Sequence, residues 1–248
     1  MEDNQDPAMG RVIGADRAGS QTIGPALSEG AASPGRIKAV IFDLGNVLID
    51  FDHMIAVQKL FQQGSSPSKG PGFMDKSPDG IFNLFFDSEL TELFEEGRLS
   101  GPQFFSRVKE MLSLKLDYDE FLPIWNEIFF FSEKNLSVYN LAVSLGKHYK
   151  LAILSNINIL HFEYIKRAFP IFNAFQIMAS FEMGLRKPQS RIYHRALEIL
   201  GVSPDSCFYA DDRPELVESA KGLGIRGFVF KDVQQLTEDL LSSGISIK

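Results

Sequence analysis

Residues 37–48 read IKAVIFDLGNVL, and this stretch decides the fold. The run from Ile37 to Phe42 is short and almost continuously apolar, and it ends on an acid, Asp43. Such a run is typical of a strand that is covered on both faces, as in a parallel sheet. The sequence therefore predicts that the ordered part of the chain begins at residue 37 with a buried strand, and that Asp43 lies at its carboxyl end.

Similar apolar runs recur in the second half of the chain and alternate with helical patterns. The runs cover residues 149–154, 175–179, 206–210 and 226–230, and the helical patterns cover 133–145, 159–169, 189–200, 214–222 and 233–241. Strands that alternate with helices indicate the α/β class, here a doubly wound, Rossmann-like parallel sheet.

About a hundred residues separate the first predicted strand from the second, far more than one crossover helix needs. We expect an inserted α-helical cap domain over 51–130, so that 37–50 and 131–248 form the core. Its section 63–80 is rich in Gly, Ser and Pro, and Ser100-Gly101-Pro102-Gln103 predicts a capping box. Aromatic residues at helical spacing after this box, and over 118–129, are expected to pack helix on helix.

Residues 1–36 lack helical periodicity and are interpreted as a flexible leader, with Met9 as a possible later start.

Composition narrows the class of function. The formal net charge is −7 and there is no basic stripe, so nucleic-acid binding is not expected. The single cysteine, Cys207, allows no intrachain disulfide framework and favours a reducing, cytoplasmic compartment. No stretch reaches the roughly 18 to 20 apolar residues that span a bilayer, so we expect no membrane association. The sequence does not indicate an oligomeric state.

Polar residues follow the first, second and fourth predicted strands, and another lies in the segment after the third. They are Asp43, the pair Ser155-Asn156, Lys187 before Pro188, and the pair Asp211-Asp212. Taken singly, each is typical of a turn, a helix cap or a solvated charge. Two adjacent acids beside a third, however, repel one another unless a cation or a proton relieves the repulsion. Ligands of open α/β sheets bind outside the carboxyl ends of the strands, where these groups would meet.

Together the four groups suit phosphoryl transfer. Asp43 can act as a nucleophile that forms an aspartyl-phosphate. Asp43 and Asp211 offer hard oxygen ligands for Mg²⁺, which needs one or two carboxylates besides water and substrate phosphate. The Ser155 hydroxyl and the Lys187 ammonium can neutralise the phosphoryl oxygens as charge spreads in the transition state.

In this order the motifs resemble those of the haloacid dehalogenase-like (HAD) hydrolases, over roughly residues 37–243. The matching segments are 42–48 (FDLGNVL), 154–156 (LSN), 186–188 (RKP) and 211–215 (DDRPE). The insert resembles the helical cap of that superfamily. The most similar branch is that of bacterial sugar-phosphate phosphatases resembling α-D-glucose-1-phosphate phosphatase, which share the DLGNV form and the Glu-x-Gly turn seen at 95–97.

The resemblance implies a Mg²⁺-dependent phosphatase, a phosphoric monoester hydrolase acting on a small phosphorylated metabolite such as a sugar phosphate. Asp43 would be nucleophile and metal ligand, with the carbonyl of Gly45 and with Asp211 as further metal ligands. Asp212, also counted with the metal site, would lie behind the direct ligands or reach the metal through water. Ser155, Asn156 and Lys187 would hold the phosphate, and Lys187 would also take part in catalysis.

Two positions depart from the family pattern. Most phosphatases of the superfamily place a second Asp where this chain has Gly45, and a positioned general acid/base is worth about 10² to 10⁴ in rate. We therefore expect slower turnover or a less demanding substrate, such as an anomeric sugar phosphate. Leu216 replaces the usual Asn or Asp and is expected to loosen the metal shell. Asp50 and Asp52 are candidates for a replacement acid, but Asp50 is interpreted as a turn or cap residue, and His53 as a hinge or surface residue.

Two alternative functions stay open. One is a relative that binds a phosphometabolite or a protein without turnover, as Gly45 and Leu216 would allow. The other is a metal-free 2-haloacid dehalogenase, which Ser155-Asn156 would permit but the Asp211-Asp212 pair disfavours.

Overall fold

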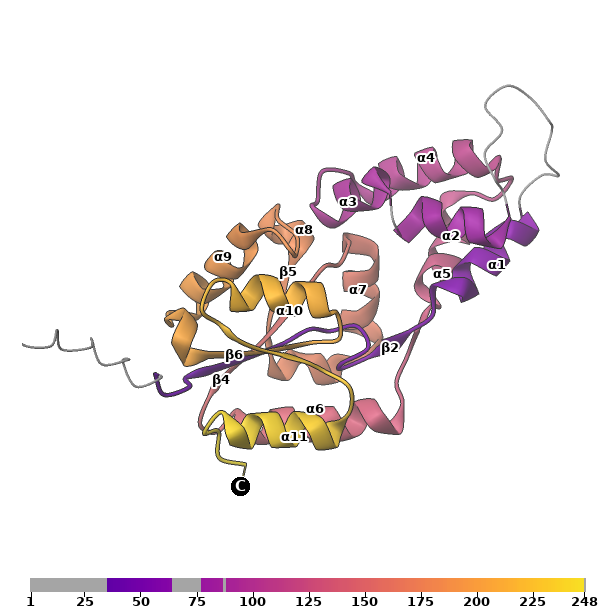
Figure 1. Ribbon diagram of the computed structural model, residues 1–248. Coiled ribbons are helices and arrows are strands. Elements are labelled where there is room, and N and C mark those ends of the chain that lie inside the picture. Colours follow the sequence, from indigo (N-terminus) through magenta and orange to yellow (C-terminus); the bar gives the residue numbers. More distant parts are fainter. Residues whose placement is uncertain (1–34, 64–76, 87, 248) are drawn as a thin grey trace, which may run out of the picture. The chain divides into compact units, whose positions relative to one another are not determined.

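A five-stranded parallel sheet forms the centre of the computed structural model, which describes residues 35–63, 77–86 and 88–247 (Figure 1). The strand order is β5-β4-β1-β6-β7. The first strand, β1, is therefore central, with β4 and β5 added on one side of it and β6 and β7 on the other. The strands are β1 (Ala39–Phe42), β4 (Lys150–Ser155), β5 (Gln176–Ala179), β6 (Cys207–Asp211) and β7 (Arg226–Val229). The predicted α/β fold is confirmed.

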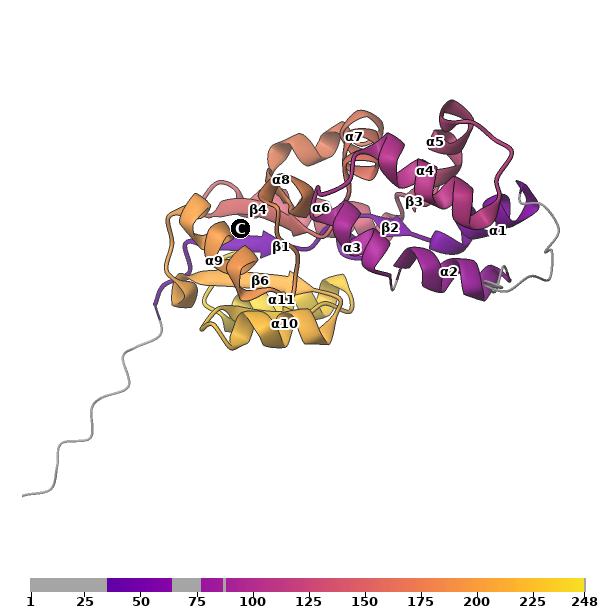
Figure 2. The ribbon, with the colours of Figure 1, turned by 90° about the horizontal axis from the view of Figure 1, so that it is seen from above.

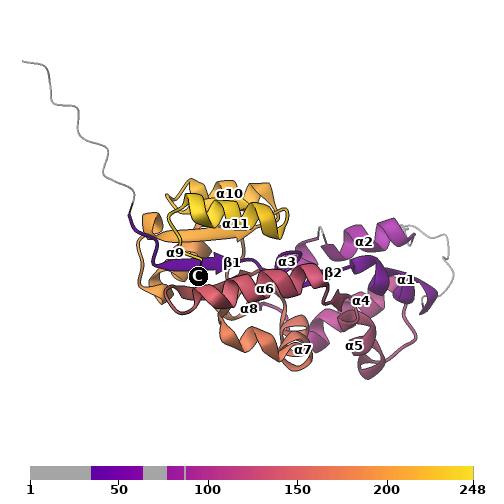
Figure 3. The same cartoon turned by 90° about the horizontal axis from the view of Figure 1, so that it is seen from below.

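Alternate side chains of each strand enter separate cores on the two faces of the sheet. Val40 and Phe42 belong to one core, whereas Ala39 and Ile41 belong to the other. The first core is closed by α6 (Glu133–Leu145), α7 (Ile159–Ala168) and α11 (Val233–Ser242), and the second by α9 (Ser190–Leu200) and α10 (Pro214–Lys221). Figure 3 looks onto α6, which lies in front of β1. Burial on both faces explains why the strands read as continuous apolar runs.

The predicted elements of the core agree with the structure to within two residues at each end. The small differences have a physical reason. Ser155 and Asp211 are polar, so the apolar runs stop before them, yet their main chains still pair with Ala179 and Val229. Three short elements complete the core: η1 (Pro170–Ala174), α8 (Ser180–Met183) and η2 (Pro204–Ser206).

The helical insert, defined here as α1 to α5, lies beyond the carboxyl ends of the strands (Figure 2). Its entry strand β2 (Asp50–Phe51) pairs antiparallel with its exit strand β3 (Phe129–Phe130), so the chain enters and leaves side by side. Its helices are α1 (His53–Gln63), α2 (Pro78–Phe86), α3 (Glu89–Glu95), α4 (Gly101–Leu112) and α5 (Tyr118–Asn126).

The domain limits at residues 36, 50 and 130 stay predictions. Nearly all of the predicted leader, including Met9, and most of the section 63–80 lie outside the described residues.

The insert has a core of its own, built on aromatic rings. Phe104 stacks on Phe94 with ring centroids 4.2 Å apart and lies 5.0 Å from the ring of Trp125. At the start of α4, Gln103 N donates to Ser100 Oγ and Ser100 N donates to Gln103 Oε1, so the predicted capping box is confirmed. The expected packing of helix on helix through aromatic stripes is also confirmed.

None of the helices within the described ranges combines the length and the apolar character that crossing a membrane requires. The cytoplasmic location stays a prediction.

Phe104→Ala should lower the free energy of unfolding by about 3–5 kcal/mol, because it removes a fully buried ring from the centre of the insert core. Phe61 lies in the same insert but is 48% exposed, so Phe61→Ala should change that free energy by no more than about 0.5 kcal/mol. Urea unfolding followed by circular dichroism measures both. Equal effects of the two substitutions would contradict this account of the core.

Candidate active site

One buried ammonium group links two carboxylates at the carboxyl edge of the sheet. Lys187 Nζ lies 2.7 Å from Asp43 Oδ1 and 2.6 Å from Asp211 Oδ2. Asp43 follows β1 and Asp211 ends the neighbouring strand β6, so the parallel register brings their side chains together. Lys187 is 2% exposed and Asp211 is fully buried. The structure thus brings together three of the predicted site residues.

Asp211 is held by two further donors. The Tyr209 hydroxyl donates to Oδ2, the oxygen that contacts Lys187, and the main-chain N–H of Arg213 donates to Oδ1 at 2.9 Å. Asp212 lies beside it and accepts a hydrogen bond of 3.0 Å from Asn46 Nδ2. These contacts fix the direction of both carboxylates.

Burial and charge act in opposite directions on these groups. Burial raises the pKa of Asp43 to about 7, although the Lys187 ammonium opposes the shift, and Asp211 adds to it. Burial also disfavours ionised Asp211, but the contact with Lys187 outweighs it and leaves the pKa of Asp211 below its usual value. The two carboxylates likewise outweigh burial at Lys187 and raise its pKa. One ammonium group therefore neutralises part of the charge of two carboxylates, and a second cation nearby would favour the ionised form of Asp43.

The donor set fits a magnesium ion. Asp43, Asp211 and Asp212 each offer a carboxylate oxygen, and these atoms all lie within 4.8 Å of one another. Gly45 lies on the wall of the same cavity. Hard oxygen donors in such a cluster are the ligands that Mg²⁺ prefers, and the ion would offset the negative charge that one ammonium leaves uncompensated. The ligand roles of these residues stay predictions.

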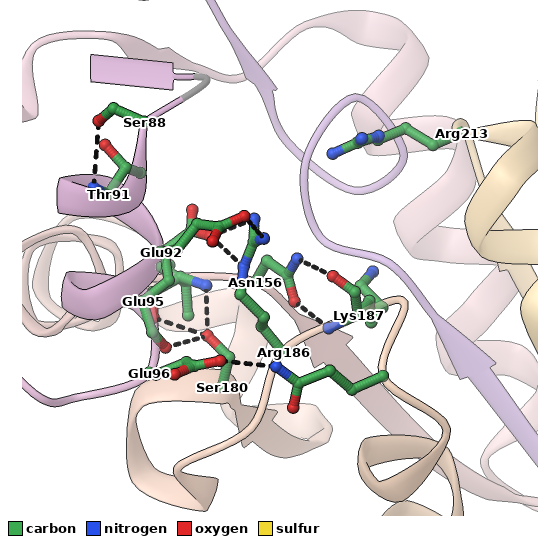
Figure 4. Close-up of polar contacts among 12 residues, drawn as sticks. Ser88, Thr91, Glu92, Glu95, Glu96, Asn156, Ser180, Arg186, Lys187 and Arg213 are labelled. Atoms are coloured by element: carbon green, nitrogen blue, oxygen red, sulfur yellow. Dashed lines mark hydrogen bonds and ion pairs between the residues drawn. The ribbon is translucent and has the colours of Figure 1, made fainter. Parts of the chain in front are cut away.

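Asn156 holds the main chain of Lys187. Its Oδ1 accepts from Lys187 N at 2.7 Å, and its Nδ2 donates to Lys187 O at 2.9 Å (Figure 4). Ser155, at the end of β4, lines the cavity beside Asp43. The side chain of Asn156 thus positions the lysine, and its second Nδ2 hydrogen and its main-chain N–H are the donors left for the predicted contact with phosphate.

Core and insert both line the cavity, whose volume is about 390 Å³. The core residues at one end of the cavity are the polar and charged groups of the predicted site and its surroundings: Asp43, Ser155, Lys187, Asp212 and Arg213. The insert contributes His53, Phe82, Thr91, Glu95 and Trp125. A substrate in this cavity would therefore meet the charged groups of the core at one end and mostly aromatic groups of the insert at the other.

The position of the missing second acid is filled by an aromatic ring. A Cβ atom added to Gly45 would lie 2.5 Å from Cε1 of Phe51, which is closer than carbon atoms approach without displacement. Phe51 belongs to β2 and lines the same cavity. An acidic side chain at position 45 would therefore have to displace this ring.

The acids and the histidine near this position have other contacts. Asp50 accepts hydrogen bonds from Ser132 Oγ and from Lys134 Nζ, and Asp52 accepts from Met54 N at the start of α1. Asp52 caps α1, whereas Asp50 lies in β2 and contacts side chains at the start of α6, so the expectation of a turn or cap residue is wrong for Asp50. His53 packs against Phe51 and is mostly buried, and burial, with a smaller contribution from His161, lowers its pKa to about 3. His53 is therefore neutral and lines the cavity, which differs from the expected surface position, and its role as a hinge at the start of α1 stays a prediction.

Leu216 is buried in α10 and lines the cavity, and its main-chain carbonyl accepts from the Tyr193 hydroxyl. Its expected effect on the metal shell stays a prediction.

Three cavity residues were missed as site residues in the sequence: Phe51, Glu95 and Arg186. Arg186 belongs to the Arg-Lys-Pro segment and Glu95 to the Glu-x-Gly turn. Their place within these two motifs was the feature of the sequence that could have identified them as site residues. Phe51 has no such signal, because its contact with Gly45 depends on the path of β2.

The family model of the haloacid dehalogenase-like hydrolases matches residues 37–224, a range that contains all four motifs. D-ribitol-5-phosphate phosphatase of Bacteroides thetaiotaomicron is 24% identical over 200 residues, which cover 77% of this chain and 91% of that protein. Flavin mononucleotide hydrolase 1 of Arabidopsis thaliana is 38% identical over 64 residues, 26% of each chain. These findings confirm the predicted family and support the predicted class, a phosphoric monoester hydrolase.

A solved structure from the same superfamily has the same fold. The wild-type HAD family enzyme of Bacteroides thetaiotaomicron, in complex with magnesium and inorganic phosphate, superposes with a TM-score of 0.67 at 24% identity. The superposition covers 79% of this chain and 96% of that one.

Gly45→Ala should lower the free energy of unfolding by about 1–3 kcal/mol, because the new methyl group overlaps the ring of Phe51. Phe51→Leu in the same chain should recover at least half of this loss, since the smaller side chain vacates the space. The wild type, both single variants and the double variant form a thermodynamic cycle measured by urea unfolding. Additive effects would show that the two positions do not compete for space.

Proposed function

Because the chain belongs to the haloacid dehalogenase-like hydrolases, we propose that it is a Mg²⁺-dependent phosphatase of a small phosphorylated sugar or sugar alcohol. The observation that carries the proposal is the buried Lys187 ammonium in contact with Asp43 and Asp211, with Asp212 in the same cluster. Such a site offers a nucleophile, cation ligands and a phosphate-binding group within one cavity.

Asp43 is the proposed nucleophile. In the first step one of its carboxylate oxygens forms a bond to phosphorus, the bond from phosphorus to the alcohol oxygen breaks, and the released alkoxide takes a proton from water. In the second step a water oxygen attacks phosphorus, the bond between phosphorus and the Asp43 oxygen breaks, and inorganic phosphate leaves. The water gives up a proton in this step, so the carboxylate is restored and the charges balance.

Lys187 is the proposed electrostatic partner of the phosphoryl group. Its raised pKa keeps it charged throughout, and Asn156 fixes the main chain from which it extends. The Ser155 hydroxyl can donate to a second phosphoryl oxygen. When bound by Asp43, Asp211 and the Gly45 carbonyl, with Asp212 at the ion or at one of its waters, Mg²⁺ supplies further neutralisation of charge.

Gly45 bears on the choice of substrate. Without an acid at this position, water has to protonate the leaving oxygen. Because water is a weak acid, this favours esters whose alcohol is a good leaving group. Anomeric sugar phosphates meet this condition. The names of the two curated relatives point to a different ester, because D-ribitol 5-phosphate and flavin mononucleotide both carry phosphate on the primary carbon of a ribityl chain. Both ester types therefore belong in the assay.

Asp43→Asn should abolish Mg²⁺-dependent release of phosphate, with a loss of about 10³-fold or more, because the nucleophilic carboxylate is removed. The assay uses para-nitrophenyl phosphate, α-D-glucose 1-phosphate and D-ribitol 5-phosphate, with Mg²⁺ or with EDTA. Asp52→Asn is the matched control, since Asp52 caps α1 and does not line the cavity.

Two results would overturn the proposal. If the wild type binds the esters but releases no phosphate, the protein is a binder without turnover. If it releases chloride from 2-chloropropionate in the presence of EDTA, it is a dehalogenase.

Mg²⁺ should stabilise the wild type, because the ion binds the folded carboxylate cluster. At ten times its dissociation constant it should add about 1.4 kcal/mol to the free energy of unfolding. This corresponds to a rise of about 3–6 °C in Tm, measured by differential scanning fluorimetry against EDTA. Asp212→Asn should weaken the effect, whereas Asp205→Asn, at an exposed acid outside the cluster, should leave it unchanged. A Tm that does not respond to Mg²⁺ would count against a metal site.

A further inference from the structure

The insert contributes one carboxylate to the cavity wall among the described residues, that of Glu95 at the end of α3. The other insert residues on this wall are His53, Phe82, Thr91 and Trp125, and His53 is neutral. Among the described residues Glu95 is therefore the one acidic group on the insert side of the cavity, and Arg186 of the core, which also lines the cavity, pairs with it. Its side chain is 18% exposed, so it is largely shielded from bulk water.

Arg186 fixes the direction of this carboxylate. Its Nε and Nη2 atoms donate to Glu95 Oε2 at 3.3 and 3.1 Å, while Nη1 donates to Glu92 Oε1 at 2.7 Å (Figure 4). Both contacts with Glu95 fall on the same oxygen, Oε2. The guanidinium balances the negative charge of Glu95 without engaging Oε1 in either of these contacts.

The main chain around Glu95 is fixed as well. Ser180 Oγ donates to Glu95 O at 2.6 Å and accepts from Ile157 N, which ties the end of α3 to the loop after β4. Gly97 has a φ of +69°, and a Cβ atom there would lie 2.3 Å from the carbonyl oxygen of Phe181. The Glu-x-Gly turn thus allows the end of α3 to approach the core closely, and it holds Glu95 in place before any ligand binds.

Glu95 also lies near the phosphate-binding groups. Arg186 directly precedes Lys187 in the chain. The charges of Arg186, Arg213 and Lys187 all act on Glu95 and oppose the rise in its pKa that burial causes. A carboxylate in this position repels the phosphate itself, so its ligand must be a hydrogen-bond donor on another part of the substrate. On a sugar or sugar alcohol that donor is a hydroxyl group.

We propose that Glu95 accepts a hydrogen bond from a hydroxyl group on the carbon chain of the substrate, and so selects polyhydroxylated phosphate monoesters over plain alkyl ones. The inference rests on the proposed phosphatase function and names the substrate class of the same site. The phosphate lies at the Lys187 end, the hydroxylated chain extends toward the insert, and the rings of Phe82 and Trp125 face its carbon–hydrogen bonds. Arg186 is a positioning residue that acts through Glu95.

The test compares two esters that differ in their hydroxyl groups, D-ribitol 5-phosphate and n-pentyl phosphate. The measured quantity is the ratio of kcat/KM for the first ester to kcat/KM for the second. A lost hydrogen bond to a buried charged group is worth about 1.5–3 kcal/mol, which corresponds to about 10- to 150-fold. Glu95→Ala should lower the ratio by that factor, and Glu95→Gln, which keeps an acceptor oxygen, should lower it less.

Glu92→Ala is the matched control. It removes the other carboxylate partner of Arg186 from the same helix, but Glu92 does not line the cavity, so the ratio should stay within about twofold of the wild type. An equal shift in Glu92→Ala and Glu95→Ala would show that docking of α3 matters and would overturn the proposal. So would a loss in Glu95→Ala that is the same for both esters.

Dissociation constants of the two esters, measured by calorimetry with Mg²⁺ in the Asp43→Asn background, separate this proposal from the proposed function. If the wild type hydrolyses neither these esters nor para-nitrophenyl phosphate, the phosphatase proposal fails. The ratio of dissociation constants, with and without Glu95→Ala, still decides whether Glu95 recognises hydroxyl groups. An unchanged ratio there would overturn the inference by itself.

Discussion

The contact of the Lys187 ammonium with Asp43 and Asp211 is the constraint on which the rest of the structure depends. Three charged groups are largely removed from water in this contact, and the Lys187 ammonium is the group that stabilises both carboxylates against burial and against each other. Loss of Lys187 from this buried set would cost about 3–5 kcal/mol, because the two carboxylates would be left uncompensated. The central place of β1 and its parallel pairing with β6 bring the two acids together, and Asn156 holds the lysine opposite them.

Much of the fold could be predicted from periodicity alone. The helix over 133–145 was predicted from its helical pattern with the bounds that the structure gives it, and the structure shows Ser132 as its N-cap. The strands were found as continuous apolar runs for the physical reason that both faces of the sheet are covered. Their carboxyl ends also pointed to Asp43, Ser155 and Asp211 as neighbours.

Contacts between side chains distant in the sequence could not be predicted in this way. Lys187 and Asp43 are 144 positions apart, and a solvated lysine has the same local sequence as a buried one. The pairing of Arg186 with Glu95 depends on how α3 docks against the start of α8 at Ser180. The engagement of both polar groups of Asn156 with the main chain of Lys187 likewise depends on three-dimensional geometry that no spacing rule expresses.

The two parts of the chain that line the cavity, core and insert, have different roles. The sheet edge holds the reacting groups, whose positions are set by strand register. The insert holds the groups that meet the remainder of a ligand, on helices packed around a separate aromatic core. Substitutions at the insert wall can therefore alter what is bound while the register that aligns Asp43 with Asp211 is left intact.

The ring of Phe51 above Gly45 also limits how this protein can evolve. An acid at position 45 would have to displace this ring, and a smaller residue at position 51 would leave a space in the cavity wall as long as position 45 is glycine. The two positions must therefore change together. Each single intermediate is expected to be less well packed than either end point, so the two substitutions should be better tolerated together than singly.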